Sequence, residues 1–156
     1  MENADSHSVP IEIIRHPLAT HQIAARRIEL RVERGTLAKR RWRGIAADER
    51  EFGFDLEKPL HDGAVFFESP DAVYVLVQLP EPVIEISIAD AGAPQAAQMG
   101  WLMGNLHFPV QVTAAVIRIA DDSAVRQALK REHIHYRERL EVFHPFKTGG
   151  GHHHAC

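Results

Sequence analysis

The chain has 156 residues, enough for one ordinary domain or two small ones, and 45% of them are hydrophobic, which is typical of a globular protein with a buried core. Its 18 basic and 21 acidic side chains give a net charge of −3, so the overall charge gives no reason to expect nucleic acid or an anionic membrane as a partner. The single cysteine, Cys156, excludes an intramolecular disulfide.

No apolar run approaches the roughly 18 to 20 residues that a membrane-spanning helix requires. Residues 1–8 are polar and acidic and lack the basic start and apolar stretch of a signal peptide. The expected location is therefore the cytoplasm.

The first half of the chain has the pattern of short strands. Apolar and polar residues alternate in residues 28–32 and 51–56, and apolar runs occupy residues 64–68 and 72–79. Turn signals separate these runs, including His61-Asp62-Gly63. The pattern predicts a small all-β domain over residues 1–79.

Two prolines at 80 and 82 interrupt the pattern and predict a linker, because proline fixes φ and removes a backbone donor. Strands and helices then alternate: a strand through 84–88, a helix from about 94, a strand at 110–119 that Ala114-Ala115 can divide, a helix capped by one of residues 121–123, and a strand at 136–143. This order predicts a ferredoxin-like domain over residues 83–147, and an α+β fold for the whole chain.

Histidine is unusually frequent, with 11 copies in 156 residues. His152, His153 and His154 follow three glycines in residues 148–156, which we expect to form a flexible tail. Imidazole binds nickel, zinc, copper and iron, and the thiolate of Cys156 would add a soft ligand. The tail therefore predicts metal capture, although glycines followed by histidines also resemble an affinity-purification tag.

A second candidate is His107, which stands in the run Gly104 to Pro109 where the predicted helix meets a strand. A single imidazole at a helix end is usually a cap, helped by the helix dipole. It becomes an effective metal site only if symmetry supplies a second copy, as at a two-fold dimer interface. Such affinity should fall as the pH drops through about 6.5, because imidazole must be neutral to bind.

The run MGWLMGNLHFPVQ over residues 99–111 resembles the GN-x-H-x-P segment of the urease accessory protein UreE family. The resemblance continues in the strand pair at 41–56, in the Leu60-His61-Asp62-Gly63 turn, in the strand at 117–119 before a capped helix, and in the closing segment 143–146. The order and spacing of these motifs agree with the family over most of the chain.

This resemblance implies a nickel metallochaperone rather than an enzyme. It implies an N-terminal β-domain of the peptide- or partner-binding type, a ferredoxin-like metal domain, and a homodimer whose motif histidines share one metal. Carried over, the motif histidine is His107, and the tail ligands are His152, His153 and His154. The metal would be Ni²⁺, with Zn²⁺ possible at the same site, and the partners would be the UreG GTPase and the urease maturation complex.

Two departures from the family matter. Leu106 stands where the family commonly has Arg or Lys, which lowers the local positive charge. Residues 120–123 carry no histidine where some members have an HxH-type pair, so an auxiliary internal site of that type is not expected.

The remaining histidines and one basic run allow further interpretations. His133 and His135 would share one face if extended, and His144 could reach toward the tail. His7, His16, His21 and His61 are expected at the surface or in turns. The basic run 39–43 predicts a solvated face or a site for an acidic protein partner rather than for nucleic acid.

Two rival functions remain. One is a protein-binding chaperone module in which metal binding is incidental; the other is a small hydrolase with His107 as base. Motifs for phosphate loops, serine nucleophiles and zinc proteases are absent from the sequence, which argues against an enzyme.

Overall fold

The computed structural model describes residues 11–19 and 26–146. The chain divides into two compact units, Met1–Leu79 and Pro80–Cys156. Each unit has its own hydrophobic core, so each is considered by itself below.

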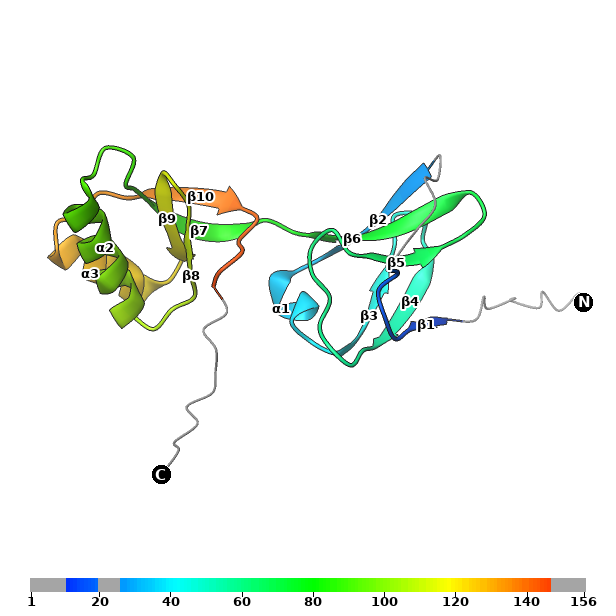
Figure 1. Cartoon of the computed structure of the whole chain (residues 1–156). Coiled ribbons are helices and arrows are strands. Elements are labelled where there is room, and N and C mark those ends of the chain that lie inside the picture. Colours follow the sequence, from blue (N-terminus) through cyan, green and yellow to red (C-terminus); the bar gives the residue numbers. More distant parts are fainter. Residues whose placement is uncertain (1–10, 20–25, 147–156) are drawn as a thin grey trace, which may run out of the picture. The chain divides into compact units, whose positions relative to one another are not determined.

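The first unit is built mainly from strands (Figure 1). Its elements are β1 (Glu12–Ile14), β2 (Arg26–Val32), α1 (Arg34–Leu37), β3 (Arg41–Ile45), β4 (Glu51–Asp55), β5 (Val65–Glu68) and β6 (Ala72–Gln78). They form two three-stranded sheets, in the orders β1-β4-β3 and β2-β6-β5. The β1–β4 and β2–β6 pairs are parallel, and the other pairs are antiparallel.

Alternating apolar residues build the core of this unit. From Ile28 onward every second residue of β2 is buried, as is expected for a strand with one face in the core. Phe52 of β4 is fully buried and meets Phe66 and Tyr74 edge to face, with ring centroids 5.0 and 5.2 Å apart. Trp42 of the neighbouring β3 stacks on Phe54, with ring centroids 3.7 Å apart.

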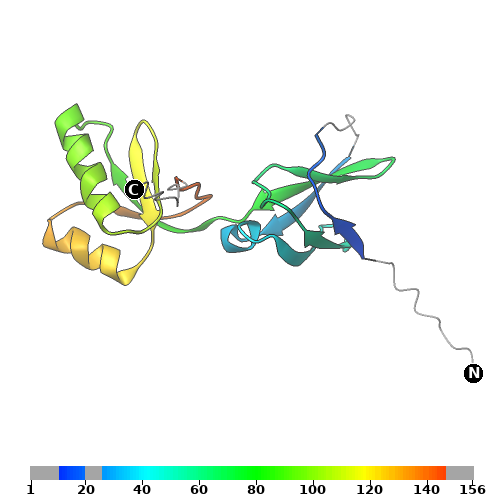
Figure 2. The same cartoon turned by 60° about the horizontal axis from the view of Figure 1, so that its bottom comes forward.

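The second unit combines one sheet with two helices (Figures 1 and 2). Its elements are β7 (Glu81–Ser87), α2 (Ala93–Asn105), β8 (Val110–Val112), β9 (Val116–Ala120), α3 (Ser123–Arg131) and β10 (Arg137–Glu141). The strands pair antiparallel in the order β10-β7-β9-β8, so the connectivity β-α-β-β-α-β is that of a split β-α-β motif.

Both helices of this unit lie on the same side of the sheet (Figure 2). Buried isoleucines of β7 and β9 form one apolar cluster with Met103 of α2 and with Val125 and Leu129 of α3. Asp122 caps the start of α3, its carboxylate accepting a hydrogen bond of 2.8 Å from the backbone N–H of Ala124.

The mixed α+β class predicted from the sequence is confirmed. Two details differ from the prediction. The expected all-β region includes the helix α1, whose single turn is too short to give a helical periodicity. Two residues of the expected linker at 80–82, Glu81 and Pro82, already belong to β7, since Pro82 pairs with Leu140 of the edge strand β10 and accepts a hydrogen bond from the amide of Asp121. The division of the strand at 110–119 that Ala114-Ala115 allowed is observed, since these residues lie between β8 and β9.

A candidate metal-binding histidine at the end of helix α2

Helix α2 contains no charged residue, and its sequence APQAAQMGWLMGN has only Met103 fully buried. Pro94 lies in its first turn, where the missing N–H costs no intrahelical hydrogen bond. Trp101 is 69% exposed, although tryptophan is usually well covered. The helix thus presents an uncharged outer face to its surroundings.

His107 lies just beyond the C-cap residue Leu106, at the point where the helix ends. Its φ is +59°, in the left-handed region, and its backbone N–H donates to the carbonyl of Gly104 over 3.1 Å. Both neighbours, Leu106 and Phe108, are half-buried and pack against the apolar cluster, whereas His107 itself is exposed. The turn therefore holds the residues on either side of the imidazole against the core.

This backbone conformation has a cost for histidine. A residue with a Cβ loses roughly 1–2 kcal/mol in the left-handed helical region, and glycine is the usual residue at this position of a helix end. Nothing about ending the helix requires an imidazole, so His107 is a good candidate for a binding role.

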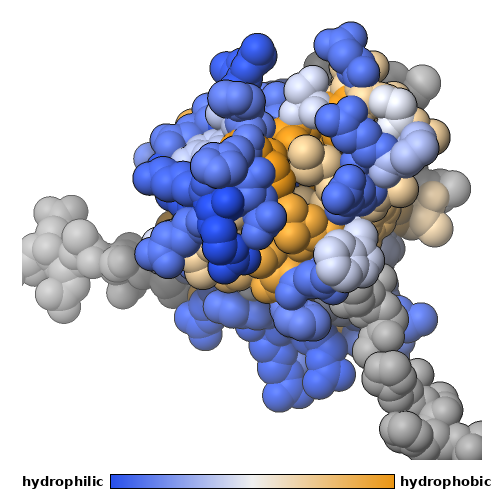
Figure 3. Space-filling view, turned by 90° about the vertical axis from the view of Figure 1, so that its left-hand side faces the viewer, coloured by the Kyte–Doolittle hydropathy of each residue, from blue (hydrophilic) through white to orange (hydrophobic). Residues whose placement is uncertain are grey.

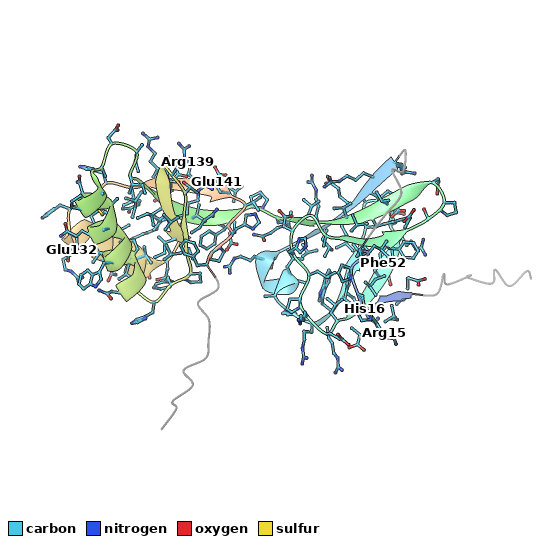
Figure 4. The ribbon with its side chains drawn as sticks, in the orientation of Figure 1. Arg15, His16, Phe52, Glu132, Arg139 and Glu141 are labelled. Atoms are coloured by element: carbon cyan, nitrogen blue, oxygen red, sulfur yellow. The ribbon has the colours of Figure 1, made fainter. Side chains whose placement is uncertain are left out.

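Helix α3 ends in the same way. His133 follows the C-cap residue Glu132, labelled in Figure 4, and has φ +55°. Its N–H donates to Lys130, and the N–H of Ile134 donates to Leu129 over 2.9 Å, which completes a Schellman motif.

The alternative in which His133 and His135 share one face of an extended segment does not hold, because the backbone at His133 is left-handed rather than extended. Within residues 11–19 and 26–146, no group of three or more His, Cys, Asp or Glu side chains is arranged to hold a metal ion. The described residues of a single copy therefore hold no ready-made site of three or more such ligands.

The last described residues run beside β8. The backbone N–H of Phe146 donates to the carbonyl of Val110 over 2.8 Å, and that of His144 donates to the side-chain oxygen of Gln111 over 3.1 Å. Phe143 is fully buried. The segment therefore advances from Gln111 toward Val110, in the direction of His107.

The predicted tail ligands His152, His153 and His154, together with Cys156, lie outside the described residues, as do His7 and His21. His16, beside Arg15 in Figure 4, and His61 are exposed in irregular segments, as the sequence suggested.

A cluster of charged side chains connects α3 to strand β10 of the sheet. Arg126 binds the carboxylate of Asp121 with two hydrogen bonds, of 2.7 and 2.6 Å, and also pairs with Glu138 of β10. The hydrogen bonds from Arg126 hold the pKa of the Asp121 carboxyl below its ordinary value, against a smaller opposing effect of burial. The same hydrogen bonds raise the pKa of Arg126, so this pair is fully ionised at neutral pH.

The first unit has a shallow hollow of about 320 Å³ on the sheet β1-β4-β3. Gly53 is one of the residues that line it, and a Cβ added there would lie 2.7 Å from the side chain of Ile13. Arg41 and Arg43 of the edge strand β3 line it together with Asp55, which binds Arg41 over 2.7 Å. Residues 41–43 of the basic run thus lie on an edge strand, with the side chains of Arg41 and Arg43 exposed.

None of the helices in the described ranges has the length and apolar character needed to cross a bilayer. The two units and the imidazole at the end of α2 define a small α+β protein whose most distinctive chemistry is an exposed histidine on a strained turn.

Comparison with known proteins identifies the family. Residues 81–156 match the family model described as UreE urease accessory protein, C-terminal domain. The urease accessory protein UreE of Pseudomonas fluorescens (strain SBW25) is 31% identical over 127 residues, which cover 76% of this chain and 73% of that relative. The chain belongs to the UreE family of urease accessory proteins, whose members assist the enzyme and are not themselves enzymes.

Two further UreE proteins are similar. That of Ruegeria sp. (strain TM1040) is 33% identical over 92 residues, covering 59% of this chain and 49% of the relative. That of Beijerinckia indica (strain ATCC 9039) is 32% identical over 115 residues, covering 71% of this chain and 61% of the relative. The matched regions thus span about half to three fifths of the length of these two relatives.

Proposed function

We propose that this protein is a nickel metallochaperone for urease, which binds Ni²⁺ through His107 and delivers it to the urease maturation machinery. The observation that carries the proposal is the exposed imidazole of His107, held on a left-handed turn in the matched part of the chain. Zn²⁺ accepts the same ligand and would compete for it.

The metal site requires more than one copy of the chain. One imidazole binds a metal weakly, and the described residues hold no cluster that would complete the site. A two-fold axis beside His107 would bring a second His107 to the same ion. We therefore propose a homodimer with its metal at the interface.

Helix α2 is the surface that we propose for this dimer. It has no charged residue, and Gly100 and Gly104 leave open space above the helix surface. Figure 3, viewed from the side on which α2 and α3 lie in Figure 1, shows hydrophobic atoms gathered between flanking hydrophilic ones. Covering Trp101 and this face with a second copy would remove apolar area from water close to His107.

The tail would supply further ligands. Phe146 is bound to Val110, which is three residues from His107 and so within about 10 Å of it along the chain. His152 is six residues beyond Phe146, a reach of up to roughly 20 Å. We infer that His152, His153 and His154 can approach the metal held by His107 and raise the local ligand concentration.

In this proposal residues 83–147 are the ferredoxin-like metal-binding domain, residues 1–79 are the partner-binding β-domain, and residues 148–156 are the tail. The partners are the UreG GTPase and the urease maturation complex, in the cytoplasm. The test is the nickel content of urease purified from nickel-limited cells that carry either this protein or its His107→Ala variant as the only UreE. We expect less nickel with the variant, and equal contents would refute delivery through His107.

A second candidate function, a protein-binding module, is supported by the hollow on β1-β4-β3. Arg41, whose side chain is 82% exposed, and Arg43 would pair with an acidic segment, whose apolar side chain would rest in the hollow beside Ile13. If this is the main function, the double variant Arg41→Glu and Arg43→Glu loses partner binding in a pull-down with purified UreG, whereas His107→Ala retains it.

A further inference from the structure

The helices α2 and α3 of the second unit end in turns of the same kind, which contain His107 and His133. In each turn a fully buried residue lies three positions before the C-cap, namely Met103 or Leu129. A left-handed histidine follows the cap, and a half-buried apolar residue, Phe108 or Ile134, comes next and packs against the shared cluster.

An apolar contact of this kind stabilises a left-handed helix end, because it fixes the residue after the turn against the last turn of the helix. Phe108 has a second constraint, since Pro109 restricts it to an extended backbone and Val110 then begins β8. Phe108 therefore lies in the short segment between the end of α2 and the start of β8, directly after His107, and its ring fixes this segment to the apolar cluster.

We propose that Phe108 is a positioning residue for metal capture: its ring, packed on the apolar cluster, holds the left-handed turn that presents the His107 imidazole. Without the ring, His107 would sample other backbone conformations, and the metal would have to order it on binding. Residues that orient a metal ligand typically alter affinity by 10- to 100-fold when replaced. This inference rests on the proposed role of His107.

Ile134 provides a matched control, because it occupies the same position in the turn that follows α3. The experiment uses the full chain with His152, His153 and His154 replaced by Ala, so that binding reports the motif site. Ni²⁺ is titrated calorimetrically into this parent and into its Phe108→Ala, Ile134→Ala, Phe108→Leu and His107→Ala variants. Thermal unfolding of each variant fixes a temperature at which all of them are folded.

We expect Phe108→Ala and Ile134→Ala to lower the unfolding temperature similarly, because each removes a half-buried apolar side chain. Only Phe108→Ala should weaken Ni²⁺ binding, on the order of tenfold, and Phe108→Leu should recover most of the affinity. Equal affinities for the two alanine variants would overturn the positioning role. A parent and a His107→Ala variant that bind Ni²⁺ equally would instead refute the proposed site itself.

Discussion

His107 and His133 occupy the same position in two different helix ends. Each directly follows a C-cap residue, each has a left-handed backbone with φ of +59° or +55°, and each donates its N–H to the carbonyl three residues earlier. Their surroundings differ in charge, since the last turn of α2 has no basic side chain whereas that of α3 contains Lys130 and Arg131. The carbonyl end of a helix favours nearby positive charge. At α3 Lys130 and Arg131 already provide this charge, whereas no side chain provides it at α2, so a cation is better accommodated beside His107.

The left-handed conformation predicts an unusual order of stabilities for variants of His107. In the absence of metal, His107→Gly should be more stable than His107→Ala by about 1 kcal/mol, because glycine adopts this backbone region without steric cost. Urea unfolding of the two variants measures the difference. The pair His133→Gly and His133→Ala should show the same order, and an alanine variant more stable than its glycine counterpart would contradict the geometry of that turn.

The uncharged face of α2 predicts a change in oligomeric state. Trp101→Glu places a charge on the surface proposed for the dimer, so the variant should be monomeric at concentrations where the parent is dimeric. Light scattering coupled to gel filtration measures the mass. The control is Leu140→Glu, because Leu140 is exposed to a similar degree, 67%, but lies on β10. A dimer that survives Trp101→Glu would place the interface elsewhere.

The Asp121–Arg126 pair predicts a pH-dependent contribution to stability. The pKa of the Asp121 carboxyl is lowered in the folded protein, so its stabilising effect is present above its ordinary value, near pH 4, and is lost as the pH falls through the lowered value. Asp121→Asn should therefore lower the free energy of unfolding clearly at pH 7 and progressively less as the pH falls below about 4.

The control for this prediction is Glu132→Gln, which removes an exposed ion pair with Arg131 whose partners are adjacent in sequence. We expect Glu132→Gln to change the free energy of unfolding only slightly at both pH 7 and pH 3. A cost of Asp121→Asn that is equal at pH 7 and pH 3 in urea titrations would show that ionisation of Asp121 does not contribute.

Two glycines of the first unit should respond oppositely to the same substitution. A Cβ at Gly44 would lie 2.9 Å from both Leu30 and Trp42, so Gly44→Ala should destabilise by roughly 1–3 kcal/mol through overpacking. Gly35 lies in α1 with nothing within 4 Å, so Gly35→Ala should be neutral or stabilising by up to about 1 kcal/mol. Thermal unfolding distinguishes them, and a stable Gly44→Ala variant would show that β2 and β3 are less tightly packed.

Much of the fold was accessible from the sequence because the responsible patterns are local. The helical pattern from about residue 94 indicated α2, and the apolar run at 72–79 indicated the central strand β6. Missed elements depend on distant partners or are too short for a pattern: β1 has three residues and exists as a strand through its pairing with β4, some forty residues away. The parallel pairing of β2 with β6 has no local signature either.

The candidate site was predictable as a residue but not as a conformation. The motif around His107 identified the imidazole, yet histidine carries no signal for a positive φ comparable to that of glycine. The conformation of His107 depends on the packing of its neighbours Leu106 and Phe108 against the apolar cluster. That packing arises only when the helix and β8 are in place, so the local sequence does not reveal it. The same limitation applies to His133, whose left-handed backbone has no signal in the sequence, and the roles of His152, His153 and His154 stay predictions.

The most direct test of a shared nickel site is the stoichiometry of Ni²⁺ binding to the chain in which His152, His153 and His154 are replaced by alanine. Calorimetry should give about one Ni²⁺ for two chains, because one His107 from each copy holds the ion. The His107→Ala variant should show no binding of this kind. One Ni²⁺ per chain, or equal binding by the variant, would contradict an interfacial site built on His107.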